Sequence, residues 1–135
     1  VETIIQKARS YIYTTALPSA LAAATLTSLQ LLVSDDWRRE KLRERVQQFR
    51  SGARQLGLPV TDSETAIQPI LVGDSHQAMR LSDALLTEAI WVSAIRPPTV
   101  PLGSARLRVT FSALHEAHHV DRLLCVLDKA WSQLS

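Results

Sequence analysis

Two arginines lie two residues apart in the alternating run from Ala105 to Phe111. Apolar residues occupy the odd positions of this run, and Arg106, Arg108 and Thr110 occupy the even positions. This alternation predicts a β-strand with one apolar and one polar face. A guanidinium group can bind a carboxylate through two parallel hydrogen bonds, so the polar face could receive an anion. Alternatively, one or both arginines are solvated or paired with Asp or Glu.

A second constellation is the run His115-Glu-Ala-His-His119, which matches the pattern His-Glu-x-x-His. In that pattern two histidines on one helix hold zinc and the glutamate acts as a base. Here the run opens a predicted helix, and the only histidine outside the run is His76. A polar first helical turn explains the same residues, so we expect no metal site. A zinc metalloprotease remains a distant alternative.

Hydroxyl groups and a stiff loop supply the remaining candidates. Thr14 and Thr15 precede Ala-Leu-Pro in a link without helical periodicity, and hydroxyl groups can donate hydrogen bonds to a phosphate. The same pair could simply belong to a polar link. Residues 96–103 contain three prolines, which remove backbone donors and exclude a central strand, and this loop carries Thr99.

The pattern of the whole chain predicts an α+β domain. We expect helices over residues 1–9, 20–33, 37–56, 76–89 and 115–134, and strands over residues 58–60, 67–72, 91–95 and 106–111. This order favours a small, mostly antiparallel sheet covered by helices on one side. We expect a single domain, in which residues 1–17 form a trailing helix and a link, and residues 18–135 form helices and the sheet.

Two of these helices have apolar surfaces that must be explained. Residues 11–34 carry no charge, but their Thr, Ser and Gln side chains argue against a membrane span and favour a helix buried in protein. The helix over residues 37–56 is amphipathic. Its expected inner stripe consists of Leu42, Val46, Phe49, Ala53 and Leu56.

Composition fits a soluble globular protein. The 135 residues are 46% hydrophobic and 21% charged, with a net charge of +2, which is too mild to indicate nucleic-acid binding. The single cysteine, Cys125, excludes an internal disulfide. It lies on an apolar helical face, so we expect a core residue in a reducing, cytoplasmic setting.

The run Arg96-Pro-Pro-Thr-Val-Pro, followed by Gly103, Ala105-Arg-Leu-Arg and Ser112-Ala113-x-His115, resembles the carboxy-terminal signature of the α-oxoamine synthases. These are fold-type-I pyridoxal phosphate (PLP) enzymes that condense an amino acid with an acyl thioester. The resemblance covers nearly the whole chain and implies the C-terminal domain of the fold-type-I PLP-dependent transferase fold. The loop most resembles the member that joins L-alanine to a pimeloyl thioester, carried by CoA or a carrier protein, in biotin synthesis. A glycine-using sister enzyme and a non-catalytic binding domain are the alternatives.

The resemblance also implies roles for single residues. Thr15, and after it Thr14, would donate to the PLP phosphate of the neighbouring subunit in a homodimer. Thr99 would lie beside the substrate, and Arg108 would take the carboxylate of the amino acid. Arg96 would meet the acyl chain. For Arg106 we expect no substrate role but only a structural ion pair.

The chain also departs from the family pattern. The family's Schiff-base lysine follows a glycine in an upstream domain, and Lys7, Lys41 and Lys129 lack that context. The chain also starts on Val1 rather than Met. We therefore expect a cut chain that contributes no catalytic residue and is inactive alone.

Overall fold

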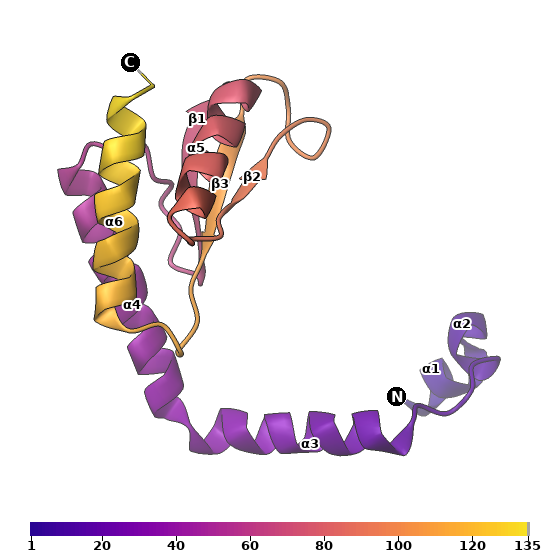
Figure 1. Ribbon diagram of the computed structural model, residues 1–135. Coiled ribbons are helices and arrows are strands. Elements are labelled where there is room, and N and C mark those ends of the chain that lie inside the picture. The colour runs from indigo at the N-terminus through magenta and orange to yellow at the C-terminus, as the bar shows by residue number, and fades with distance from the viewer. Residues whose placement is uncertain (135) are drawn as a thin grey trace. The chain divides into compact units, whose positions relative to one another are not determined.

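The computed structural model describes residues 1–134 and divides the chain into two compact units, Val1–Asp36 and Trp37–Ser135. Each unit is described by itself. The elements, in chain order, are α1 (Glu2–Lys7), α2 (Arg9–Ile12), α3 (Ser19–Ser34), α4 (Asp36–Gln55), β1 (Ile67–Gly73), α5 (Ser75–Thr87), β2 (Ser93–Ile95), β3 (Ala105–Thr110) and α6 (Ala117–Ser132) (Figure 1). The assignment of the whole chain to a single domain stays a prediction.

Unit 1 contains the long uncharged helix α3 and two short helices. The helix is confirmed, but the prediction that it is buried is wrong for this chain, because no residue of α3 is buried. Its neighbours in the unit, α1 and α2, have only 6 and 4 residues and bury none of their own side chains, so they offer little surface to cover it. Among the described residues, no helix has both the length and the apolarity that a membrane crossing requires.

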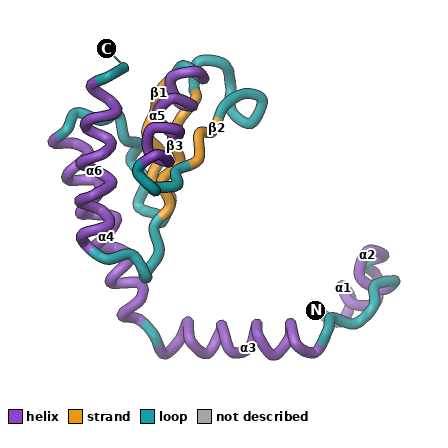
Figure 2. Tube along the Cα trace, in the orientation of Figure 1, coloured by secondary structure: helices purple, strands orange, loops and turns teal. Residues whose placement is uncertain are grey.

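Unit 2 is built around an antiparallel sheet with β3 in the centre, in the order β1-β3-β2 (Figure 2). This architecture confirms the predicted α+β class and the mostly antiparallel sheet. The predicted strand over residues 58–60 is reduced to a single bridge between Val60 and Ile70. Pro59 has no N–H to donate, so this segment cannot extend a full ladder along β1.

One face of the sheet forms the core with three helices. Ala105, Leu107 and Val109 of β3 are buried, as the alternation predicts. The helices contribute buried side chains from α4 (Val46, Phe49, Ala53), α5 (Ala78, Leu81, Leu85) and α6 (Val120, Leu123, Leu127, Ala130). Burial of this apolar surface holds the sheet against the helices, and it leaves the even-numbered residues of β3 on the opposite face.

Two predictions about burial are wrong in detail. Cys125 is exposed rather than part of the core. The buried stripe of α6 runs through Leu123 and Leu127, and a residue midway between them lies on the other side of a helix with 3.6 residues per turn. Leu56 is 37% exposed, because α4 ends at Gln55 and the chain turns away at Gly57, whose φ is +69°.

An ion pair connects α4 to the start of α6. Lys41 Nζ lies 2.5 Å from Glu116 Oε1, and this hydrogen bond, together with the charge of Lys41, lowers the pKa of Glu116. A carboxyl group with a lowered folded-state pKa stabilises the fold above its unfolded pKa, and that contribution is lost as the pH falls through the folded pKa.

We therefore expect Glu116→Gln to lower the melting temperature at neutral pH. The melting temperature of this variant should also decrease less than that of the wild type when the pH is lowered from neutral to about pH 3, which is below the ordinary pKa range of carboxyl groups. Thermal unfolding at a series of pH values measures the effect, which is small because the pair is exposed to solvent. Glu64→Gln is the matched control, because Glu64 is exposed and has no ion pair among the described residues. The prediction would be contradicted if the melting temperatures of Glu116→Gln and the wild type decreased equally as the pH falls.

Candidate functional site

Arg108 lies on the open face of the central strand. Its register partners are Pro69 on β1 and Ser93 on β2, so both neighbours in the sheet present small groups beside it. The side chain is exposed, and no carboxylate of the described residues pairs with it. An unpaired guanidinium on a firmly held strand is suited to bind a ligand carboxylate.

Arg106 lies two residues earlier on the same face. It is half-buried, and its Nε donates a hydrogen bond of 3.1 Å to the carbonyl oxygen of Ser104. The expected structural ion pair is wrong for the described residues. The backbone just before the strand supplies an acceptor that the side-chain pattern alone could not reveal.

The loop between β2 and β3 carries Thr99 and closes the hairpin that holds both arginines. Thr99 is exposed, and its N–H donates to the carbonyl of Arg96 at 3.1 Å. Gly103 has a φ of +74°, in the left-handed region that glycine adopts without a steric penalty, and the Pro97–Pro98 peptide bond is cis. Figure 1 shows the loop projecting beyond the sheet, on the side away from α6. The three residues therefore belong to one hairpin: Thr99 lies in its loop, Arg106 pairs with the last residue of β2, and Arg108 pairs with the first.

Thr14 and Thr15 belong to unit 1, a different unit from the hairpin. Both are exposed and line a hollow of about 820 Å³ together with residues of α1 and α2. The Thr14 hydroxyl donates to the Tyr11 carbonyl at 2.7 Å, whereas the Thr15 hydroxyl has no hydrogen-bond partner within residues 1–134. A free hydroxyl in a hollow fits a phosphate oxygen, and this supports the order in which we rank the two threonines.

The histidine run does not form the geometry of a zinc helix. His115 Nδ1 accepts from the Ser112 N–H, and His119 Nδ1 accepts from the Glu116 N–H, both at 3.0 Å. Because α6 begins only at Ala117, His115 precedes the helix and does not share a helical face with His119. Within the described part of the chain, no three His, Cys, Asp or Glu side chains are grouped to hold a metal ion.

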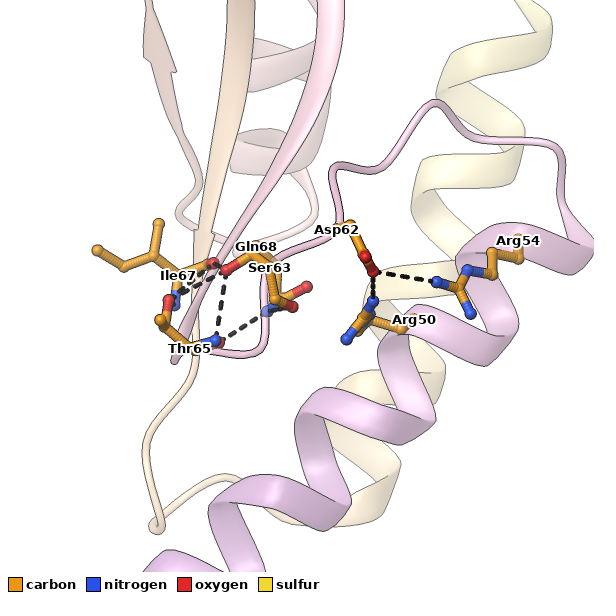
Figure 3. A network of polar contacts seen from close by, with 7 residues as sticks. All are labelled: Arg50, Arg54, Asp62, Ser63, Thr65, Ile67 and Gln68. Atoms are coloured by element: carbon orange, nitrogen blue, oxygen red, sulfur yellow. Dashed lines mark hydrogen bonds and ion pairs between the residues drawn. The ribbon is translucent and has the colours of Figure 1, made fainter.

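A polar network that sequence reasoning missed anchors β1 beside the central strand. Gln68 is fully buried, and its Nε2 donates to the carbonyls of Ser63 and Thr65 at 2.9 and 2.7 Å. Asp62 in the same loop pairs with Arg50 and Arg54 of α4 (Figure 3). These contacts hold the start of β1, which includes Pro69 opposite Arg108. Gln68 lies two residues before Ile70, so the alternation of a strand places both side chains on the buried face. This spacing is the sequence feature from which the burial of Gln68 could have been predicted.

A separate hollow of about 400 Å³ lies at the far end of β3 from the loop. Its lining includes Trp91, Thr110, His115 and His119. None of the candidate residues Thr14, Thr15, Thr99 and Arg108 contributes to it. The candidate site is therefore the open face of the hairpin rather than this hollow.

A protein family and several curated proteins match nearly the whole of this chain. The family model for aminotransferase class I and II matches residues 1–127. The 8-amino-7-oxononanoate synthase of Nitrosococcus oceani is 60% identical over 124 residues, which is 92% of this chain and 33% of the relative. That of Pseudomonas paraeruginosa is 58% identical over 100% of this chain and 34% of the relative. The chain thus spans about a third of the length of the curated relatives it matches.

Solved structures of two enzymes also match nearly the whole of this chain. The 8-amino-7-oxononanoate synthase of Francisella tularensis is 30% identical, with a TM-score of 0.84 over 98% of this chain and 38% of that protein. A serine palmitoyltransferase from S. paucimobilis with a bound PLP–myriocin aldimine is 28% identical, with a TM-score of 0.87 over 96% of this chain and 33% of that protein. The resemblance to the α-oxoamine synthases and the predicted fold class are confirmed by these matches. Because the family model spans nearly the whole length, the chain belongs to the class I and II aminotransferase family.

Proposed function

We propose that this chain is the carboxy-terminal part of an 8-amino-7-oxononanoate synthase, which condenses L-alanine with a pimeloyl thioester in biotin synthesis. The observation that carries the proposal is the exposed, unpaired Arg108 on the hairpin that also presents Thr99. Its context is a chain 58% identical over its whole length to a synthase of that name. The cofactor is pyridoxal phosphate. The enzyme works as a homodimer in the cytoplasm.

The hairpin's role in the reaction is to bind and orient the amino acid. Arg108 holds the substrate carboxylate in two directed hydrogen bonds, which fixes the amino acid relative to the cofactor. Thr99, at the loop, lies beside the substrate and limits its movement. Pyridoxal phosphate, when bound, supplies the electron sink for the reaction. Because none of Lys7, Lys41 and Lys129 follows a glycine, as the family's Schiff-base lysine does, we assign no covalent role to a lysine of this chain.

Thr15 gives a prediction for the cofactor. In the full-length enzyme Thr15→Val should weaken PLP binding by about tenfold to a hundredfold, since a hydrogen bond to a charged group contributes roughly 1.5–3 kcal/mol. Thr14→Val should have the smaller effect, because the Thr14 hydroxyl is already engaged by Tyr11. Equilibrium dialysis of the apoenzyme against PLP measures both. Equal affinities for wild type and Thr15→Val would remove Thr15 from the phosphate site.

The proposed function itself is tested with the full-length enzyme, L-alanine and pimeloyl-CoA. We expect 8-amino-7-oxononanoate, identified by mass spectrometry, with release of one carbon dioxide per product. Replacing L-alanine by glycine separates the sister synthases, because a glycine-using enzyme would turn over faster with glycine. A protein that forms no product with either amino acid would instead support the non-catalytic binding domain.

A further inference from the structure

Arg106 and Arg108 place two guanidinium groups on one open face of β3. Residues two apart on a strand lie roughly 6.6 Å apart along it, so the two side chains are immediate neighbours on that face. No carboxylate of residues 1–134 pairs with either of them. Two neighbouring cations without a counter-ion are suited to a ligand with two anionic groups.

The surroundings of Arg106 differ from those of Arg108. Its register partners are Leu71 on β1 and Ile95 on β2, both apolar, whereas Arg108 lies between Pro69 and Ser93. Arg106 is half-buried between these neighbours, which strengthens its attraction for an anion relative to a fully solvated arginine. The hydrogen bond from Nε to the Ser104 carbonyl fixes the plane of the guanidinium and leaves both Nη groups free to donate.

We propose that Arg106 binds the carboxylate at the far end of the acyl group and so makes the site specific for thioesters of dicarboxylic acids. The inference rests on the proposed function and adds a residue that selects the acyl substrate. Arg108 takes the amino acid carboxylate, and the acyl group is joined to the carbon that bears it. The aliphatic chain then runs along β3 to the second guanidinium, which Leu71 and Ile95 flank on the two neighbouring strands.

Arg96 is the appropriate comparison. It also belongs to the hairpin, but it is exposed and is not flanked by a strand residue on each side. The sequence resemblance assigned the acyl chain to Arg96. The structure favours Arg106 instead, because only Arg106 combines partial burial, a fixed guanidinium plane and apolar neighbours.

The experiment compares pimeloyl-CoA with heptanoyl-CoA, which has the same chain length but lacks the terminal carboxylate. Calorimetry with the full-length holoenzyme and no amino acid measures binding of each thioester without turnover. We expect wild type to prefer pimeloyl-CoA, and Arg106→Ala to reduce that preference about tenfold to a hundredfold, as for loss of a charge-assisted contact. Arg106→Lys should retain part of the preference, since the charge remains. Arg96→Ala should retain all of it, and the dissociation constant of L-alanine, measured without a thioester, separates loss of the acyl contact from loss of the amino acid contact in Arg106→Ala.

Three results would overturn the inference. These are equal binding of the two thioesters by wild type, an equal loss of affinity for both in Arg106→Ala, and loss of the preference in Arg96→Ala alone. An equal loss is what a merely structural role predicts. The proposed function fails separately, if wild type makes no product from L-alanine and pimeloyl-CoA, because the binding measurement needs no turnover.

Discussion

Arg108→Ala in the full-length enzyme should weaken L-alanine binding by about tenfold to a hundredfold, because hydrogen bonds to charged groups contribute roughly 1.5–3 kcal/mol and each factor of ten is about 1.4 kcal/mol. The side chain is exposed on the open face of β3, so the substitution removes a ligand contact and leaves the core intact. Arg108→Lys should restore little, since an ammonium group cannot reproduce the two parallel hydrogen bonds of a guanidinium. Spectroscopic titration of the holoenzyme with L-alanine measures the affinity.

The control for this prediction is the neighbouring arginine. Arg106→Ala removes an equal charge from the same strand face, but it should leave the affinity for L-alanine unchanged. The melting temperature of Arg108→Ala should stay close to that of wild type. The assignment is contradicted if Arg108→Ala keeps full alanine affinity and turnover while Arg106→Ala loses both.

The strand and its two faces could be predicted from the sequence because a strand has a period of two residues. Every apolar residue of the run from Ala105 to Val109 is buried, and Arg108 on the other parity is exposed. The loop could be predicted from the sequence equally well, since three prolines and Gly103 allow few backbone conformations. Local steric rules determine these features, so local sequence is enough to predict them.

Burial and pairing could not be predicted in the same way, because they depend on which distant atoms come close. The sequence of α3 predicts a helix with an apolar surface, but it does not predict which atoms cover that surface within this chain. Cys125 lies on a helix with strong apolar character and is still exposed, because only one stripe of α6 meets the core. Arg106 bonds to the carbonyl of Ser104, an acceptor that every residue carries and that no sequence motif reveals.

Phe49→Ala should be the most destabilising single change in unit 2 that we predict, with a loss of about 3–5 kcal/mol in the free energy of unfolding. Phe49 is fully buried in α4, and its ring centroid lies 5.2 Å from that of Phe111, directly after β3. Truncation removes buried apolar surface and also leaves a cavity between the helix and the end of the strand. A loss of this size is a large fraction of the 5–15 kcal/mol typical of whole proteins, and thermal and denaturant unfolding would show it directly.

Leu56→Ala is the matched control for Phe49→Ala, because Leu56 follows the same helix and shares its apolar sequence pattern but is 37% exposed. It should cost well under half as much, since much of its side chain stays in contact with water in the folded state. Phe49→Leu should fall between the two, because it keeps part of the buried volume. Equal losses for Phe49→Ala and Leu56→Ala would show that the apolar stripe, rather than burial against Phe111, determines the contribution of α4.

Because Phe111 lies three residues beyond Arg108 on the same segment, Phe49→Ala should also raise the KM for L-alanine by loosening the end of β3.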